Sequence, residues 1–240
     1  MKKLTKKQYL KPNDAVLPPA PSGEVWTPPQ PSKGERRFKL TSKGSVRGFV
    51  VIDGVRVNFE SRAEYKAFLV IRSRPDTLRM VEQSPRVQYL DGAGKIRTHV
   101  FDCKVWRRDG SIVAVDVKPA AKVESSGIRE THSLIAGQIS PKIASRLLVF
   151  TERMYTPADF YNAELMLGVA RQHCLEDDEA ILKLVARMKG PMKIGDLVAK
   201  SGRFGYGFNA IVRAIAAGRL VMTERRRIDY AAVVAPAPLH

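Results

Sequence analysis

One stretch, Val100 to Pro119, constrains the fold of this 240-residue chain more than any other. It reads VFDCKVWRRDGSIVAVDVKP, two runs of alternating apolar residues around a turn with glycine, which is the pattern of a β-hairpin. Strand interiors rarely hold Asp or Lys. Asp102, Asp116 and Lys118 nevertheless lie inside the two runs, so we expect them to serve something other than packing.

The turn of this hairpin decides whether the two aspartates meet. A two-residue loop over 109–110 puts the aspartates on opposite faces of the hairpin. A three-residue loop over 108–110 places Asp102 directly across from Asp116, with Gly110 supplying the left-handed conformation that such loops need. The sequence permits both loops.

Two carboxylates that meet need a cation, because like charges at close range cannot both ionise cheaply. Oxygen ligands favour Mg²⁺ or Mn²⁺. Residues two apart on a strand share a face, so Lys118 is expected beside Asp116 and next to the metal. Its ammonium group would stabilise charge on a phosphate or help to deprotonate an attacking water.

Glu64 is the candidate for a third carboxylate ligand. It lies on a helix predicted from Ser61 to about Ser73, with Glu60 as the alternative acid. Ser61 and Glu64 also have the S-x-x-E spacing of a capping box, in which Glu64 bonds the backbone N–H of the N-cap residue Ser61. The spacing alone favours capping over metal binding.

The charge of the chain indicates its class of partner. Lys and Arg number 41 against 24 Asp and Glu, a net charge of +17, which favours a polyanion such as nucleic acid. A transmembrane helix and a signal peptide are not expected, because long apolar runs are missing. Two cysteines without metal or disulfide spacing suit a reducing cytoplasm.

The chain divides into four segments by composition and periodicity. Residues 1–35 hold seven prolines and a lysine cluster, and are expected to form a flexible, disordered basic arm. Residues 36–174 interleave strands and helices, so an α/β domain is predicted. Residues 175–235 contain three short helices followed by two strands, the order of a winged helix, and 236–240 form a tail.

Within the α/β domain the periodicity predicts individual elements. These are a hairpin around Asp53-Gly54, the helix from Ser61, strands over 86–91 and up to Trp106, a strand over 111–119, helices around 130–137 and 141–146, a strand over 146–152 and a helix capped by Thr156.

At this point the ordered motifs resemble a known group. Ser61-x-x-Glu64, Glu82-Gln83-Ser84-Pro85, Phe101-Asp102 and Asp116-Val117-Lys118-Pro119 resemble the PD-(D/E)xK nuclease superfamily. More narrowly, they resemble the TnsA-type endonuclease subunit of heteromeric transposases, as do LLVFTERMYTPADFYNAELM and the C-terminal part. The resemblance covers about residues 45 to 230. Phe101 replaces the proline of the family motif, and Ser84 is inserted after Gln83.

The resemblance implies an α/β fold with a restriction-endonuclease-like mixed sheet flanked by helices. It implies Mg²⁺ (or Mn²⁺) as cofactor, with Glu64, Asp102 and Asp116 as metal ligands. Lys118 becomes the catalytic lysine, and Gln83 shapes the site.

The implied reaction is hydrolysis of one DNA strand at each transposon end. A DDE-type transposase would cut the other strand in cut-and-paste transposition, and an ATP-dependent regulator would contact the C-terminal domain. The alternatives are a stand-alone restriction, repair or junction nuclease, and a non-catalytic DNA-binding adaptor.

Glu64, Asp102 and Asp116 are called the acid cluster below. Several basic or polar residues outside it are candidate DNA contacts. A solvated surface position, or a protein-docking role for the C-terminal part, is the alternative for each. His99, His132 and His173 lack metal spacing and are expected to be ordinary histidines. The candidate DNA contacts are Lys122, Arg129, Tyr206, Asn209, Arg213, Arg225, Arg226 and Arg227.

Overall fold

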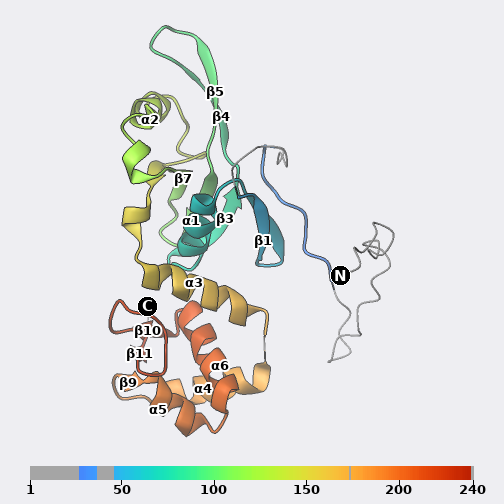
Figure 1. The fold of residues 1–240 in the computed structure, drawn as a ribbon, viewed down its shortest axis with the longest axis vertical. Helices are drawn as coiled ribbons and strands as arrows, with labels where there is room; N and C mark the ends of the chain where they lie inside the picture. Colours follow the sequence, from blue (N-terminus) through green and yellow to red (C-terminus); the bar gives the residue numbers. More distant parts are fainter. Residues whose placement is uncertain (1–26, 37–45, 173, 239–240) are drawn as a thin grey trace, which may run out of the picture.

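A computed structural model of the chain describes residues 27–36, 46–172 and 174–238. The chain forms an upper α/β part and a lower, mainly helical part, with helix α3 (Pro157–Ala170) between them (Figure 1). Most of the predicted arm lies outside the described residues. No helix in the described ranges is long and apolar enough to cross a membrane.

The centre of the upper part is a four-stranded mixed sheet in the order β3-β6-β7-β8. Its strands are β3 (Thr77–Glu82), β6 (Cys103–Arg107), β7 (Ile112–Val117) and β8 (Arg146–Phe150). Neighbours are antiparallel except for β7 and β8, which are parallel. The prediction of a mixed α/β fold is confirmed, although β3 was missed in the sequence.

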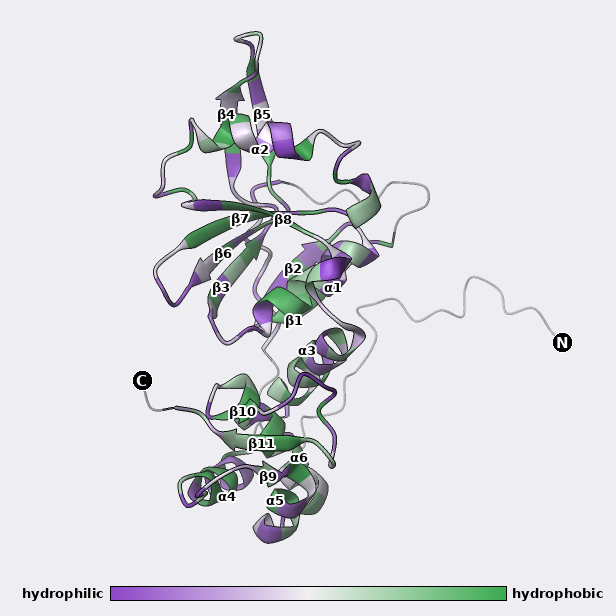
Figure 2. Cartoon of the chain, turned by 90° about the vertical axis from the view of Figure 1, so that its left-hand side faces the viewer, coloured by the Kyte–Doolittle hydropathy of each residue, from purple (hydrophilic) through white to green (hydrophobic). Residues whose placement is uncertain are grey.

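Helices cover both faces of this sheet because its central strands are apolar on both sides. Helix α1 (Arg62–Arg72) packs Phe68 and its neighbours against Val105 and Val115 on one face. Helix α2 (Ile128–Ala136) packs Ile135 against Ala114 and Phe101 on the other. Figure 2 shows the two helices on opposite sides of the strands.

Two further hairpins flank the sheet. β1 (Gly48–Ile52) and β2 (Val55–Phe59) form the predicted hairpin around Asp53-Gly54. β4 (Arg86–Leu90) and β5 (Ile96–Val100) form a ribbon that projects from the upper part (Figure 1). The single strand predicted up to Trp106 is therefore two strands, β5 and β6, with a break at Phe101-Asp102.

The break changes which way the side chains face. In a regular strand Phe101 and Cys103 share a face. Here Phe101 lies in the core under α2, whereas Cys103 lies in the core under α1. Simple alternation consequently fails just before Asp102.

The helix predicted around 141–146 is wrong. Residues 140–144 form turns, and the chain then joins the sheet because the Ser145 N–H donates to the Ile112 carbonyl at 2.8 Å. Short 3₁₀ helices occupy Ala120–Lys122 and Glu152–Met154. Helix α3 begins as predicted, with a capping box between Thr156 and Asp159.

The lower part holds α4 (Leu175–Val185), α5 (Ile194–Ser201) and α6 (Phe204–Ala216) around their own core. The same part contains a three-stranded antiparallel sheet in the order β10-β11-β9, whose strand β9 lies between α4 and α5 in the chain. Its strands are β10 (Leu220–Met222), β11 (Val233–Pro236) and the short β9 (Met192–Lys193). Helix α3 contributes Val169 to this core and Ala163 to the core of the upper part.

Residues 27–36 are part of the folded structure. Gln30 bridges the first hairpin, since its N–H donates to Gly54 and its carbonyl accepts from Arg56, both at 2.8 Å. The Glu35 carboxylate accepts hydrogen bonds from the Ser84 hydroxyl at 2.6 Å and the Arg86 N–H at 3.0 Å. The prediction of a flexible arm is therefore wrong for residues 27–35, which these hydrogen bonds hold to the α/β part.

Candidate functional site

The turn between β6 and β7 sets the register of the two aspartates. Trp106 pairs with Ile112 and Cys103 with Val115, so the loop is the three-residue one over 108–110. Gly110 has the required positive φ of 80°. Continued by one residue, this register places Asp102 opposite Asp116.

The pKa of Asp102 is shifted by the other charged groups of the predicted site. Burial, followed by the charge of Glu64, raises the pKa of Asp102 to about 7. The charge of Asp116 also raises this pKa, and that of Lys118 lowers it. The four predicted residues therefore lie in one electrostatic neighbourhood.

Glu64 caps its helix, although not in the predicted way. The Ser61 hydroxyl accepts from the Glu64 N–H at 3.1 Å and donates to Oε1 of Glu64 at 2.9 Å. Oε2 accepts the backbone N–H of Glu60, not that of the N-cap residue, at 2.9 Å. Burial raises the pKa of Glu64 in spite of these bonds. The carboxylate is thus both a cap and a member of the acid cluster.

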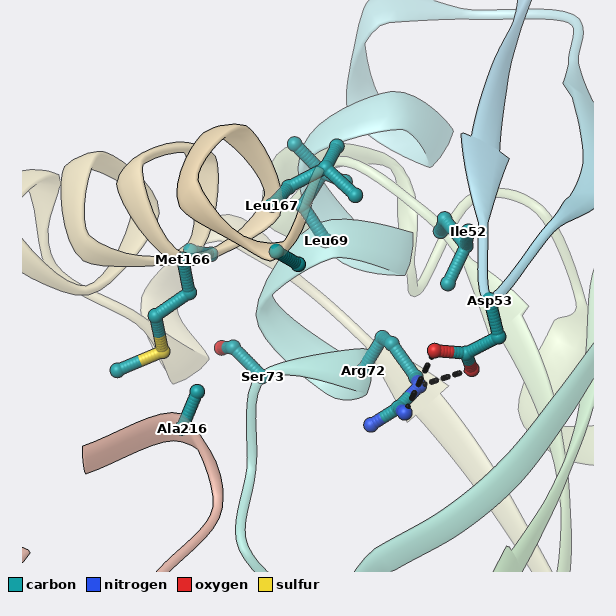
Figure 3. Close-up of a pocket in the computed structure, with 10 residues that line it drawn as sticks. Ile52, Asp53, Leu69, Arg72, Ser73, Met166, Leu167 and Ala216 are labelled. Carbon is teal, nitrogen blue, oxygen red and sulfur yellow. Dashed lines mark hydrogen bonds and ion pairs between the residues drawn. The ribbon is translucent and has the colours of Figure 1, made fainter. Parts of the chain in front are cut away.

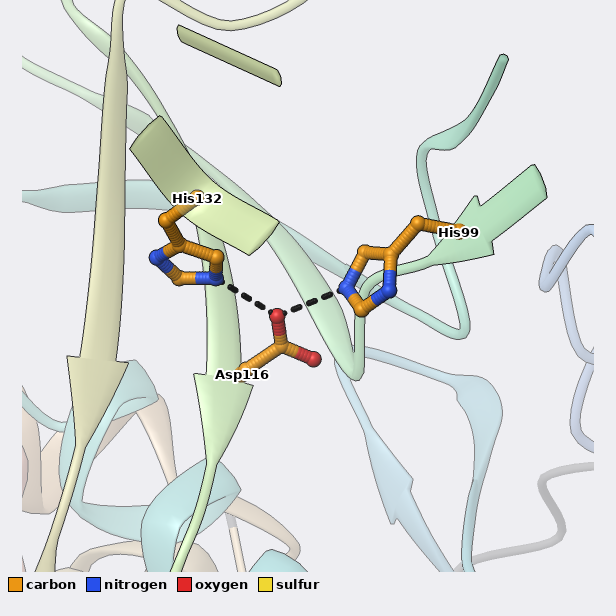
Figure 4. Close-up of side chains that lie close together, drawn as sticks. All are labelled: His99, Asp116 and His132. Atoms are coloured by element: carbon orange, nitrogen blue, oxygen red, sulfur yellow. Dashed lines mark hydrogen bonds and ion pairs between the residues drawn. The ribbon is translucent and has the colours of Figure 1, made fainter. Parts of the chain in front are cut away.

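Asp116 faces two histidines that the sequence interpretation set aside. Its Oδ2 lies 2.8 Å from Nε2 of His99 on β5 and 2.7 Å from Nε2 of His132 on α2 (Figure 4). Burial alone would raise the pKa of Asp116, but the hydrogen bonds from His132 and His99 outweigh it and lower the pKa. Asp116 is thus favoured as the ionised acid.

The closest grouping of metal-ligand atoms differs from the predicted one. Within the described part of the chain, the only set of three whose atoms all lie within 4.8 Å of one another is His99, Asp116 and His132. The predicted ligands Glu64, Asp102 and Asp116 do not converge as closely. No spacing rule could have identified the histidines, because the three groups come from different elements and His99 is reoriented by the break at Phe101-Asp102.

Gln83 lies against the acid cluster through its backbone. Its N–H donates to the Asp102 carbonyl at 2.7 Å, and its φ of 49° is unusual for a residue other than glycine. The side chain is buried. Its Oε1 accepts from Arg36 at 2.6 Å, whereas its Nε2 has no hydrogen-bond partner.

Arg36 was missed as a site residue. Besides Gln83, its guanidinium bonds Glu60 at 2.6 Å, and its charge favours the ionised form of Glu64. The segment 27–36 therefore holds a cation at the edge of the acid cluster.

Lys118 opens onto a groove at the end of β7. Its backbone N–H donates to Phe150 at 3.0 Å, and its side chain lines the groove together with Arg62, Lys66 and Glu152. Three cations therefore line one groove at the end of the strand that carries Asp116, an arrangement that suits a phosphodiester backbone.

A separate pocket lies between α1, α3 and α6. Ile52, Leu69 and Met166 line it, together with the Asp53–Arg72 ion pair (Figure 3). None of the predicted site residues is among its lining residues, so we place the candidate site at the acid cluster.

The predicted DNA contacts of the upper part are exposed. Lys122 lies in the 3₁₀ helix after β7, and Arg129 at the start of α2 pairs with Glu124 at 2.9 Å. Both can still reach a ligand at the surface.

The predicted contacts in the lower part have different environments. Tyr206 on α6 is 73% exposed, while Arg213 on the same helix bonds Asp178 and the Gln172 carbonyl, both at 2.7 Å. Asn209 also bonds Gln172. The donors of Arg213 and Asn209 are engaged within the protein.

The three consecutive arginines between β10 and β11, residues 225–227, also differ in their contacts. Arg225 pairs with Asp159 of α3, and Arg226 pairs with Asp229. Arg227 is exposed and lies over the Tyr161 ring at 4.9 Å. Arg225 thus holds this loop against α3.

Neither the family models nor the curated proteins that were searched match this chain. A functional conclusion accordingly depends on the geometry of the site and on its motifs.

Proposed function

We propose that this chain is a divalent-metal-dependent DNA endonuclease of the PD-(D/E)xK type. One observation carries the proposal. The β6–β7 register ends one residue short of Asp102 and Asp116, the Val117 N–H between Asp116 and Lys118 donates to Asp102 at 2.7 Å, and Glu64 is close enough to raise the pKa of Asp102. The ordered acids and the lysine of the motif thus share one neighbourhood.

The residues present fit a divalent cation. Buried acids are costly unless they are protonated or paired with positive charge, and Asp102 has a pKa of about 7 for this reason. Glu64, Asp102 and Asp116 offer oxygen donors, which suit Mg²⁺ or Mn²⁺. When bound, such an ion makes a water nucleophilic and stabilises charge on a phosphoryl oxygen.

The remaining groups bind and orient the substrate. The Lys118 ammonium holds the scissile phosphate and neutralises charge that develops on it. Arg62 and Lys66 bind neighbouring backbone phosphates along the same groove. The net charge of +17 steers the protein to DNA.

The lower part supports a role in binding double-stranded DNA. Three helices with a small antiparallel sheet, whose first strand lies between α4 and α5, fit a winged helix with α6 as the recognition helix. Tyr206 and Arg227 are exposed for contact, whereas Arg225 anchors the wing. Transposon ends are the proposed DNA.

On the resemblance of the motifs, we further propose that this activity belongs to a heteromeric transposase. The chain would be its TnsA-type subunit in the cytoplasm, cutting one strand beside a DDE-type transposase. An ATP-dependent regulator would contact the lower part.

The test is cleavage of supercoiled and transposon-end DNA with Mg²⁺ or Mn²⁺, with and without a DDE-type transposase as partner. Asp102→Asn and Lys118→Ala are expected to lower the rate about 100-fold or more while DNA binding persists. Asp196→Ala and Lys183→Ala, both at exposed positions, are matched controls. Full activity of either site variant would refute the proposal. Cleavage by the chain alone would instead identify a stand-alone nuclease.

A further inference from the structure

The two histidines on Asp116 form a second constellation beside the acid cluster. They come from different elements, His99 from β5 and His132 from α2, and both Nε2 atoms point at the same carboxylate oxygen (Figure 4). The nuclease site proposed above uses Asp116 but neither histidine.

The three side chains are held in place before any ligand arrives. Phe101 packs against both rings, with centroids 4.7 Å from His99 and 5.4 Å from His132. The side chains of Asp116, His132 and His99 are 4%, 11% and 20% exposed. The cluster is therefore preorganised, and His99 provides the most open side for entry of an ion and for further ligands.

We propose that His99, Asp116 and His132 form a binding site for a transition-metal ion of the Zn²⁺ class. Two imidazole nitrogens and one carboxylate oxygen suit Zn²⁺, Co²⁺ or Mn²⁺ much better than Mg²⁺, which prefers oxygen alone. The proposal concerns a different ion from the Mg²⁺ of the nuclease site, and the two ligand sets have only Asp116 in common.

The ligand geometry requires only a small adjustment. Metal–ligand bonds of about 2.0–2.1 Å in a tetrahedron separate the ligand atoms by about 3.3 Å. The observed separations of 2.8 and 2.7 Å from Oδ2 must therefore widen by about half an ångström. Small side-chain rotations supply this, and each ligating Nε2 then carries no proton.

The shared carboxylate links the two sites. Both rings use Oδ2 of Asp116, so Oδ1 remains as the ligand oxygen for the proposed nuclease site. An ion bound by the histidines would fix β5, β7 and α2 around Asp116 and hold that oxygen in position. This linkage depends on the proposed function, but the binding site itself does not.

The experiment titrates Zn²⁺ into untagged, full-length protein labelled with ¹⁵N in histidine, without DNA. The imidazole Nε2 resonances of His99 and His132 are expected to shift together and saturate at one equivalent. If both stay unchanged while Zn²⁺ is added, the site does not exist. Because the signal comes from the wild-type chain, this result stands even if a variant fails to fold.

Variants test the same site through its affinity for Zn²⁺, measured by competition with a chelating dye. His132→Gln and His99→Gln are expected to weaken binding about 100-fold or more. Glu130→Gln, at an exposed position on the same helix as His132, is the matched control and should stay within about threefold, because Glu130 lies outside both proposed ligand sets. Equal affinity of wild type and His132→Gln overturns the proposal. If the wild type binds Zn²⁺ but does not cleave DNA even with its partner, only the nuclease function is refuted.

Discussion

The backbone N–H of Val117 donates a hydrogen bond to Oδ2 of Asp102 at 2.7 Å. This bond joins the end of β7 to the residue just before β6, where the regular ladder has already stopped. It fixes the Asp102 carboxylate next to the strand that carries Asp116 and Lys118. The Asp102 carboxylate thus accepts the Val117 N–H at a point where the β6–β7 ladder no longer provides a backbone carbonyl.

Asp102→Asn is expected to stabilise the metal-free protein at neutral and higher pH. The pKa of Asp102 is raised from 3.8 to about 7 in the folded state, so the stability contributed by its protonated form is lost as pH rises through about 7. That loss is at most about 4 kcal/mol, and Asn does not suffer it. Urea unfolding should show the variant more stable at about pH 8, with the difference shrinking towards about pH 4.

Mg²⁺ supplies the control for this prediction. A bound cation removes the repulsion between Asp102 and Glu64, so saturating Mg²⁺ should raise the free energy of unfolding of the wild type much more than that of Asp102→Asn. A variant that is less stable than the wild type at about pH 8 would contradict the assigned burial of this charge.

Arg36→Ala is expected to loosen the segment 27–36 from the body of the protein. The substitution removes the bonds from Arg36 to Gln83 and Glu60, together worth about 1–2 kcal/mol to local docking. Cleavage of this segment by a nonspecific protease, followed by mass spectrometry, should accelerate about 5- to 30-fold. Lys33→Ala, at an exposed position in the same segment, should leave the rate unchanged. Equal rates for the two variants would show that Arg36 does not hold the segment.

The sequence predicted most of the elements but not the way the site is assembled. Alternation and turn residues were sufficient for the hairpin at Asp53-Gly54, and capping chemistry was sufficient for the start of α3 at Thr156. Whether Asp102 lies opposite Asp116 could not be predicted, because the two-residue and the three-residue loop each have an allowed register.

Other features depend on contacts between distant residues. Periodicity could not show the break at Phe101-Asp102, because each side chain there packs into a core formed by a different helix. The approach of His99 and His132 to Asp116 and of Arg36 to Gln83 likewise follows from tertiary structure.

Lys66→Ala is expected to weaken DNA binding by a similar factor for every sequence. Lys66 lines the groove beside Lys118, where it would neutralise one backbone phosphate. The slope of the logarithm of the binding constant against the logarithm of salt concentration should fall by about 1. Fluorescence anisotropy over a salt series measures this slope. Lys183→Ala, which removes one exposed charge from α4, should preserve it, and an unchanged slope for Lys66→Ala would exclude this groove as the DNA path.

Asn162→Ala is expected to weaken the junction between α3 and the lower part. The Asn162 amide donates to the Arg226 carbonyl at 2.9 Å, and its carbonyl accepts from the Ile228 N–H at 2.8 Å. Ile228 is fully buried, so its N–H would be left without a partner, and the free energy of unfolding should fall by about 2 kcal/mol. Asn162→Asp keeps an acceptor for Ile228 and should lose less. Urea unfolding followed by circular dichroism compares the three proteins. A change below about 0.5 kcal/mol for Asn162→Ala would mean that the junction is held by the shared apolar core instead.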